Sequence, residues 1–83
     1  MASESRKSIP FEKLLGQVVA DSRRSAGYSQ EALADLCGLH ATYISQLERG
    51  VKSPTVRVLR AIAAALEMPA SKLLAKAEAL SGK

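Results

Sequence analysis

The stretch from Gly27 to Gly50, GYSQEALADLCGLHATYISQLERG, decides the fold of this 83-residue chain. Glycine stands at both ends and at position 38. Gly38 divides the stretch into two segments, and each is too short to be stable as an isolated helix. Two short helices on a tight connection that contains glycine are typical of a helix-turn-helix. The sequence therefore predicts this supersecondary motif between residues 27 and 50.

The second segment, residues 41–49, has two chemically different sides. At about 100° per residue, Ile44 and Leu47 lie on one side, and the opposite side carries Thr42, Ser45, Gln46 and Arg49. A glutamine amide can pair with adenine, a guanidinium with guanine or phosphate, and a threonine methyl group can contact thymine. An ordinary solvated face is the alternative, although it more often carries Glu and Lys. The pattern favours a helix that reads DNA bases in the major groove.

Apolar residues at helical spacing predict about three further helices around this pair. The first follows Pro10 and ends near Ala26, before Gly27. Ser29 is expected to cap the helix that follows, and Thr55 a later one. Pro69 is expected to begin the last helix. The predicted apolar faces are Phe11, Leu14, Leu15, Val18 and Val19; Leu33, Leu36 and Cys37; Val56, Leu59, Ile62, Ala63 and Leu66; and Leu73, Leu74, Ala77 and Leu80.

No strand pattern is evident, so the sequence predicts an all-α fold, a compact bundle of about five helices. We expect one domain over residues 9–80, a flexible arm at 1–8 and a frayed tail at 81–83.

Charge points to an anionic partner. The chain has 12 basic and 8 acidic residues, a formal net charge of +4 and a pI near 9.6. Nucleic acid is the first candidate, and a surface that merely happens to be basic is the alternative. No apolar run is long enough to span a membrane. Double-stranded DNA is therefore the expected partner, and no interaction with a membrane is expected.

Cys37 is the only cysteine, so the chain has no internal disulfide and no multi-cysteine zinc site. His40 is the only histidine. A reducing cytoplasm is the natural compartment for such a chain. A catalytic Cys–His pair has no orienting partner here, and no set of acid, base, nucleophile and metal ligands converges. The sequence therefore predicts no enzyme, no metal site and no cofactor, and no small-molecule ligand is evident from it.

Further residues carry a family resemblance. They are Gly16, Arg23, the GYSQEALA run at 27–34, Gly38, the TYISQLERG run at 42–50, Ser53-Pro54 and the IAAALEMP run at 62–69. With them, the segment from Leu15 to Leu74 resembles the XRE-type, lambda-repressor-like helix-turn-helix family. Its small format most resembles phage-type repressors and the controller proteins of restriction–modification systems.

The resemblance implies roles for individual residues. Gln30 would reach a DNA phosphate and support the next helix, while Thr42, Ser45 and Gln46 would read bases. Tyr43 would reach the DNA backbone, and Arg49 and Lys52 would contact phosphates. Arg23 and Glu48 would form an internal salt bridge, with a DNA contact as the alternative for Arg23. Two residues depart from the pattern: Ala41 stands where a basic residue is frequent, and Ser22 where an apolar residue is usual.

Together these features predict a sequence-specific transcriptional regulator, such as a repressor, that binds a palindromic operator as a homodimer. The expected dimer interface is the stripe Leu73, Leu74, Ala77 and Leu80 on the last helix. Closure of the monomer core by this stripe is the alternative. A rival function is a protein-interaction module, an antitoxin or adaptor with the same fold.

Overall fold

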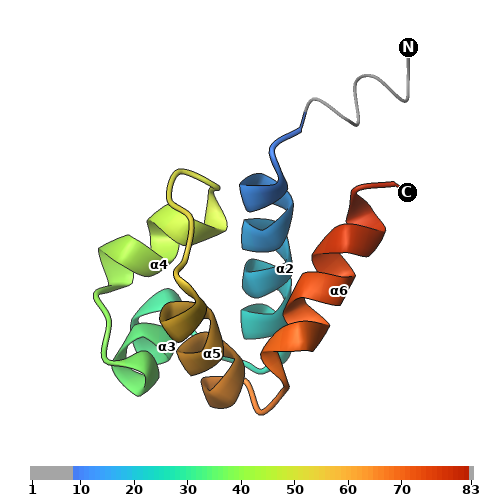
Figure 1. The fold of residues 1–83 in the computed structure, drawn as a ribbon. Coiled ribbons are helices and arrows are strands. Elements are labelled where there is room, and N and C mark those ends of the chain that lie inside the picture. Colours follow the sequence, from blue (N-terminus) through green and yellow to red (C-terminus); the bar gives the residue numbers. More distant parts are fainter. Residues whose placement is uncertain (1–8, 83) are drawn as a thin grey trace.

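The computed structural model describes residues 9–82, which form five α-helices and no β-strand (Figure 1). Their bounds are α2 (Phe11–Ser25), α3 (Gln30–Cys37), α4 (Ala41–Glu48), α5 (Val56–Ala65) and α6 (Ala70–Leu80). The predicted all-α fold is confirmed. The predicted arm at 1–8 and the last residue, Lys83, lie outside the described residues.

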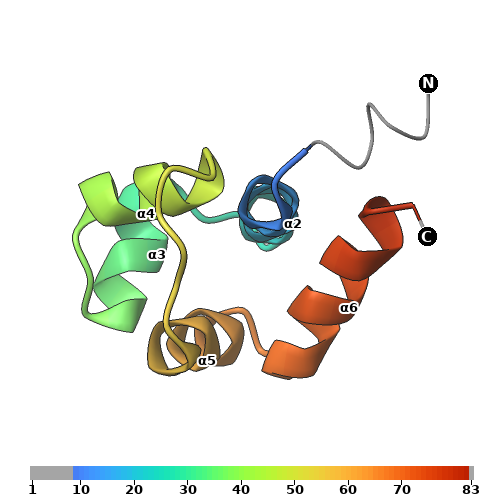
Figure 2. The ribbon, with the colours of Figure 1, turned by 45° about the horizontal axis from the view of Figure 1, so that its top comes forward.

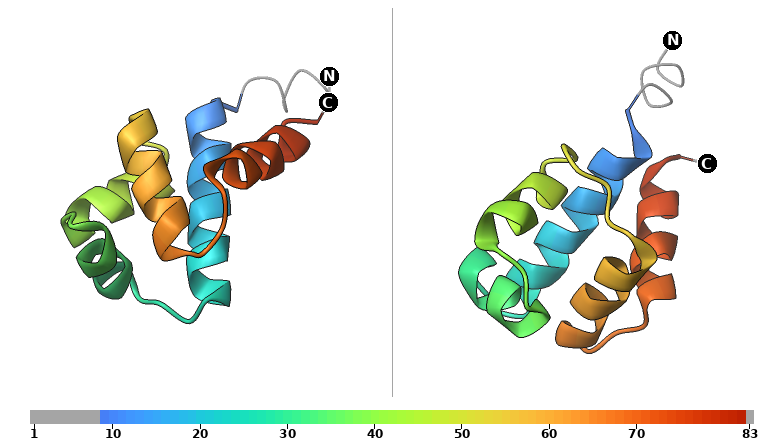
Figure 3. Two further views of the ribbon diagram at one scale, coloured as in Figure 1. Left: turned by 60° about the horizontal axis from the view of Figure 1, so that its bottom comes forward. Right: turned by 60° about the vertical axis from the view of Figure 1, so that its left-hand side comes forward.

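Helix α2 is the centre of the arrangement. It packs against α4 on one side and against α6 on the other, and Figure 2 shows it between them. Helices α3 and α4 pack on each other as the predicted tight pair, and α5 contacts both α3 and α6. The two views of Figure 3 show the same order, with α4 and α6 on different sides of α2. The helix-turn-helix is thus held against the bundle through α2 and α5.

Local sequence signals set the helix ends as predicted. The Ser29 hydroxyl accepts a hydrogen bond of 3.0 Å from the backbone N–H of Ala32, and the Thr55 hydroxyl accepts one of 3.1 Å from Val58. Each cap satisfies a donor that the first helical turn leaves without a partner. Gly38 ends α3 with φ of 71°, a left-handed conformation that glycine adopts without a steric penalty. This glycine allows the sharp turn between α3 and α4.

The core draws apolar residues from all five helices. Its largest fully buried side chains are Leu33, Ile44, Ile62 and Leu73. A bundle this small depends on close helix contacts, and α2 and α4 make one at Gly16. A β-carbon built at Gly16 would collide with the carbonyl oxygen of Leu47 and would lie 2.6 Å from that of Glu48. Gly16 is one of the residues that carry the family resemblance. The structure explains why glycine stands there, because a side chain would push α4 away from α2.

Five residues of the predicted apolar faces are exposed: Phe11, Leu74 and Leu80 at 36%, 37% and 43%, and two others to a larger extent. Leu36 is 57% exposed and Val56 is 75% exposed. The buried face of α3 is formed by Leu33 and Ala34, and Leu36 lies roughly 110° from the centre of that face on a helical wheel. Val56 lies in the first turn of α5, about 70° from the centre of its buried face. The helical period was right, but which residues of each stripe face inward depended on where the neighbouring helix packs.

Candidate nucleic-acid interface

Helix α4 has an apolar side and a polar side, as predicted. Ile44 and Leu47 are buried, with 0% and 2% of their surfaces exposed. On the other side Thr42 is exposed and Ser45 and Gln46 are half-buried. Figure 1 shows α4 at one side of the molecule, opposite α6. The three residues predicted to read bases therefore lie together on a face that the bundle leaves open.

The end of α4 and the turn after it carry the predicted phosphate contacts. Arg49 is the C-cap of α4, so the helix ends at Glu48, one residue before the end of the predicted 41–49 segment. The carbonyl oxygen of Gln46 accepts backbone hydrogen bonds from Val51 at 2.9 Å and Lys52 at 3.4 Å. These bonds fold the turn back onto the end of the helix. Arg49 and Lys52 are both exposed there, and their phosphate contacts stay a prediction.

Tyr43 has a different environment from the base-reading candidates. It is half-buried and packs against the hydrophobic core from the edge of α4. An aromatic ring on the core with its hydroxyl at the edge suits a contact with the DNA backbone. That contact also stays a prediction.

The predicted internal salt bridge joins α2 to the end of α4. Arg23 donates from Nε to Oε2 of Glu48 at 2.7 Å and from Nη2 to Oε1 at 3.1 Å. The two side chains are only 10% and 6% exposed. A third bond, from Nη1 of Arg23 to the backbone carbonyl of Tyr28, measures 2.9 Å. The hydrogen bond to Glu48, opposed by burial, raises the pKa of Arg23 above its ordinary value. All three of these hydrogen bonds of Arg23 lie inside the bundle, as expected for a structural residue.

Gln30 completes this cluster from the first turn of α3. Its amide nitrogen Nε2 donates a hydrogen bond of 2.9 Å to Oε1 of Glu48, the oxygen that also accepts from Arg23. A carboxylate only accepts hydrogen bonds, so this contact fixes which end of the Gln30 amide faces α4. The resemblance predicted that Gln30 supports the next helix, and this bond is such a support. Its phosphate contact stays a prediction.

For two of these contacts the sequence did not indicate the bonding partner. Gln30 and Glu48 are 18 residues apart, and the bond from Arg23 to the Tyr28 carbonyl uses a backbone atom that every residue has. Only the packing of α2, α3 and α4 around one carboxylate brings the groups together. Covariation between positions 30 and 48 in related sequences is the kind of signal that could have found the first contact.

Neither a reactive cysteine nor a metal cluster is supported within residues 9–82. Burial raises the pKa of the Cys37 thiol, which disfavours the reactive thiolate. Across residues 9–82 no group of three or more His, Cys, Asp or Glu side chains could hold a metal ion. No helix in the same range is long and apolar enough to cross a membrane.

Curated proteins with similar sequences are regulators. The chain is 37% identical over 68 residues to control protein C.SmaI of Serratia marcescens, covering 82% of this chain and 81% of that one. It is 42% identical over 62 residues to control protein C.BamHI of Bacillus amyloliquefaciens, covering 74% and 76%. Transcriptional regulator ClgR of Mycobacterium tuberculosis is 34% identical over 62 residues, 75% of this chain and 55% of that protein.

Solved structures agree with these relatives. ClgR of Corynebacterium glutamicum superposes with a TM-score of 0.84 at 25% identity, over 87% of this chain and 77% of that one. The restriction–modification controller protein C.AhdI of Aeromonas hydrophila has a TM-score of 0.73 at 32% identity, over 75% of this chain and 94% of that one. The HTH_3 helix-turn-helix pattern matches residues 19–73, which include α3, α4 and α5. The chain belongs to this family, the XRE-type helix-turn-helix transcriptional regulators.

Proposed function

We propose that this DNA-binding regulator recognises a specific double-stranded operator with α4 in the major groove, acts as a homodimer on a palindrome, and works in the cytoplasm. The observation that carries the proposal is the open face of Thr42, Ser45 and Gln46 on a helix anchored through Glu48. Side chains that read base edges must be held in place by a rigid support. The buried Arg23–Glu48 pair and its bond to Gln30 provide such a support at the end of α4.

Selection of bound sequences from a random DNA pool tests the proposal. We expect enrichment of a palindrome whose half-site centres lie about one helical turn apart, on the order of 34–36 Å, or a multiple of it. Binding with no preferred sequence, or no retained DNA, would contradict specific recognition. It would return the chain to the rival function of an adaptor or antitoxin that binds another protein.

Alanine at Gln46 and alanine at Lys52 are expected to weaken DNA binding in different ways. Gln46→Ala should cost about 1–3 kcal/mol on the operator and relax the preference at one base pair, because it removes a base contact. Lys52→Ala should weaken operator and scrambled DNA alike and flatten the salt dependence, because it removes a phosphate contact. Fluorescence anisotropy titrations on both DNAs at several salt concentrations measure the difference.

Arg60→Ala is a matched control for loss of charge, because Arg60 is exposed on α5 and has no assigned DNA contact. It should leave the preference for the operator unchanged. An equal loss on both DNAs for Gln46→Ala would remove this residue from the base-reading set.

Two residues of the predicted dimer stripe are buried within a single chain. Leu73 and Ala77 have no exposed surface within a single chain, because they pack into the core where α6 meets α2 and α5. They close the monomer core and are not available to a second copy. Leu74 and Leu80 remain 37% and 43% exposed. We therefore propose that the dimer contact uses Leu74 and Leu80.

Leu74→Glu and Leu80→Glu are expected to shift the protein toward monomer without unfolding it. Burying a leucine contributes about 1.5–3 kcal/mol, and a symmetric contact uses each residue twice. The monomer should stay helical, because the fully buried core residues are untouched. It should bind a half-site weakly and lose its preference for the full palindrome.

Sedimentation of wild type and variants, with and without operator, measures this shift. Glu78→Lys, on the exposed surface of the same helix, is the control and should not change the association state. A wild type that stays monomeric at high concentration and binds one asymmetric site one-to-one would disprove the dimer.

A further inference from the structure

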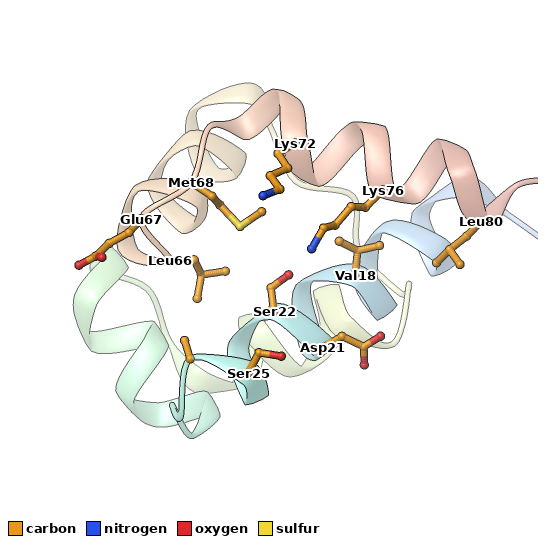
Figure 4. A pocket seen from close by; sticks show the side chains of 11 residues that line it. Val18, Asp21, Ser22, Ser25, Leu66, Glu67, Met68, Lys72, Lys76 and Leu80 are labelled. Atoms are coloured by element: carbon orange, nitrogen blue, oxygen red, sulfur yellow. The ribbon is translucent and has the colours of Figure 1, made fainter.

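A pocket of about 530 Å³ lies between α2 and α6, away from the residues assigned to DNA contacts (Figure 4). One of its lining residues, Leu80, is also proposed above for the dimer contact. The turn from α5 to α6 closes one end of it, through Leu66, Glu67 and Met68. Its volume falls in the range of about 300–1,000 Å³ that is usual for small-molecule sites. Ser22 contributes to the space. Its short side chain is half-buried in the wall of the pocket, where a longer apolar side chain would reduce the volume.

The pocket has an apolar part. Val18 from α2, with Leu66 and Met68 from the end of α5 and the turn after it, contribute hydrocarbon and thioether surface. Figure 4 shows these three side chains around the same space. An apolar group placed there would lose contact with water, which is favourable.

The pocket is lined by charged groups of both signs, with Lys72 and Lys76 on α6 and the carboxylates of Asp21 and Glu67, and by the neutral Ser22 and Ser25. In Figure 4 the side chains of Lys72 and Lys76 extend from α6 over the pocket, and the Ser22 and Ser25 side chains face them from α2. The two lysines are four residues apart, so one turn of α6 brings both to the same side. Two ammonium groups and two hydroxyls can together donate several hydrogen bonds to one anionic group.

Carboxylates do not neutralise these lysines. Neither Lys72 nor Lys76 has a carboxylate oxygen within 4.0 Å among residues 9–82. Glu67 points away from the pocket in Figure 4. Asp21 lies at the edge, and one of its oxygens is 3.3 Å from Nη1 of Arg24. The pocket therefore combines an apolar surface with two lysines that form no ion pair among residues 9–82, and its two carboxylates lie at the edge or point away.

We propose that this pocket binds a small organic anion with a compact apolar body, such as a carboxylate that carries a hydrocarbon chain. The anionic group pairs with Lys72 and Lys76, and the apolar body covers Val18, Leu66 and Met68. Pairing of a carboxylate with ammonium groups is a charge-assisted interaction, stronger than a neutral hydrogen bond. The apolar surface sets the preference for such a molecule over a bare inorganic anion.

The location separates this site from the candidate nucleic-acid interface. Figures 1 and 2 show α2 between α4 and α6, so Lys72 and Lys76 lie on the other side of α2 from the base-reading residues. The anion site thus does not depend on DNA binding. Its failure would leave the proposed operator recognition untouched.

Titration of the ¹⁵N-labelled protein with sodium octanoate tests the proposal by NMR. We expect saturable shifts of amide signals in the second half of α2 and the first half of α6. Acetate lacks the apolar body and octylammonium carries the opposite charge, so each should bind at least about tenfold more weakly. Equal affinity for octanoate and octylammonium, or shifts spread over α3 and α4, would overturn the site. The site would also be overturned if DNA shifted the amide signals of α2 and α6 and octanoate did not.

Three variants separate the pocket from general charge effects. The double variant Lys72→Met with Lys76→Met should weaken octanoate binding at least about tenfold. Lys13→Met removes one charge at an exposed position outside the pocket and should leave the affinity unchanged. Ser22→Leu should weaken binding at least about tenfold while both lysines remain, because its side chain reduces the space between α2 and α6. Its melting temperature should stay equal or rise, which shows that the fold is intact. Unchanged binding by Ser22→Leu or by the double methionine variant would refute the proposal.

Discussion

Replacing Glu48 by alanine is expected to lower the free energy of unfolding by about 3–5 kcal/mol, because it leaves the buried Arg23 guanidinium without its counter-charge. The pair is almost fully covered, with side-chain exposures of 10% and 6%. Three side-chain hydrogen bonds to the Glu48 carboxylate disappear at once, two from Arg23 and one from Gln30. For a domain of this size, such a loss corresponds to a fall in melting temperature of more than about 12 °C.

Two companion variants make the Glu48 measurement specific. Asp35→Ala removes a carboxylate from the exposed surface of α3 and should change stability by less than about 0.5 kcal/mol. Arg23→Met combined with Glu48→Leu should recover much of the lost stability, since a buried pair replaced by apolar side chains leaves no stranded charge. Thermal and denaturant unfolding of the four proteins measures the coupling. An unchanged midpoint for Glu48→Ala, with altered DNA binding, would return Arg23 to the DNA contacts.

Alanine in place of Gly16 is expected to destabilise the protein, although alanine is the better helix former. Helix propensity alone favours alanine by about 1 kcal/mol. The added methyl group would collide with the carbonyl oxygen of Leu47 and lie 2.6 Å from that of Glu48. These are backbone atoms, which cannot rotate away, so the end of α4 must move. Overpacking of this kind costs about 1–3 kcal/mol or more, enough to outweigh the gain in propensity.

DNA binding should suffer with the Gly16 substitution, because the displaced segment carries Arg49 and the turn to Lys52. Gln17→Ala is the matched control: the next residue of α2 is exposed, so alanine there meets no neighbour and should be within about 0.5 kcal/mol of wild type. Denaturant unfolding and operator titration of both variants measure the two effects. A Gly16→Ala protein as stable as Gln17→Ala, with full operator affinity, would mean that α2 and α4 tolerate a wider separation.

Local signals carried most of the prediction of the fold. Apolar residues at helical spacing predicted the helices, and glycine, proline and the capping hydroxyls of Ser29 and Thr55 predicted their ends. These signals act between residues a few positions apart, so they can be read along the chain. The face of α4 was predictable for the same reason, since Ile44 and Leu47 oppose Thr42 and Gln46 on one short helix.

Tertiary packing decided which members of a stripe are buried and which groups meet across helices. Leu73, Leu74, Ala77 and Leu80 share one helical spacing, yet only Leu73 and Ala77 enter the core, because α6 turns that part of its surface toward α2 and α5. Glu48 receives Arg23 and Gln30 from two other helices, at sequence separations of 25 and 18 residues. The sequence by itself determined the helices and their outward chemistry. The buried cluster and the pocket beside Lys72 arise only when the helices pack, because burial and hydrogen bonding between distant residues depend on the relative positions of the helices.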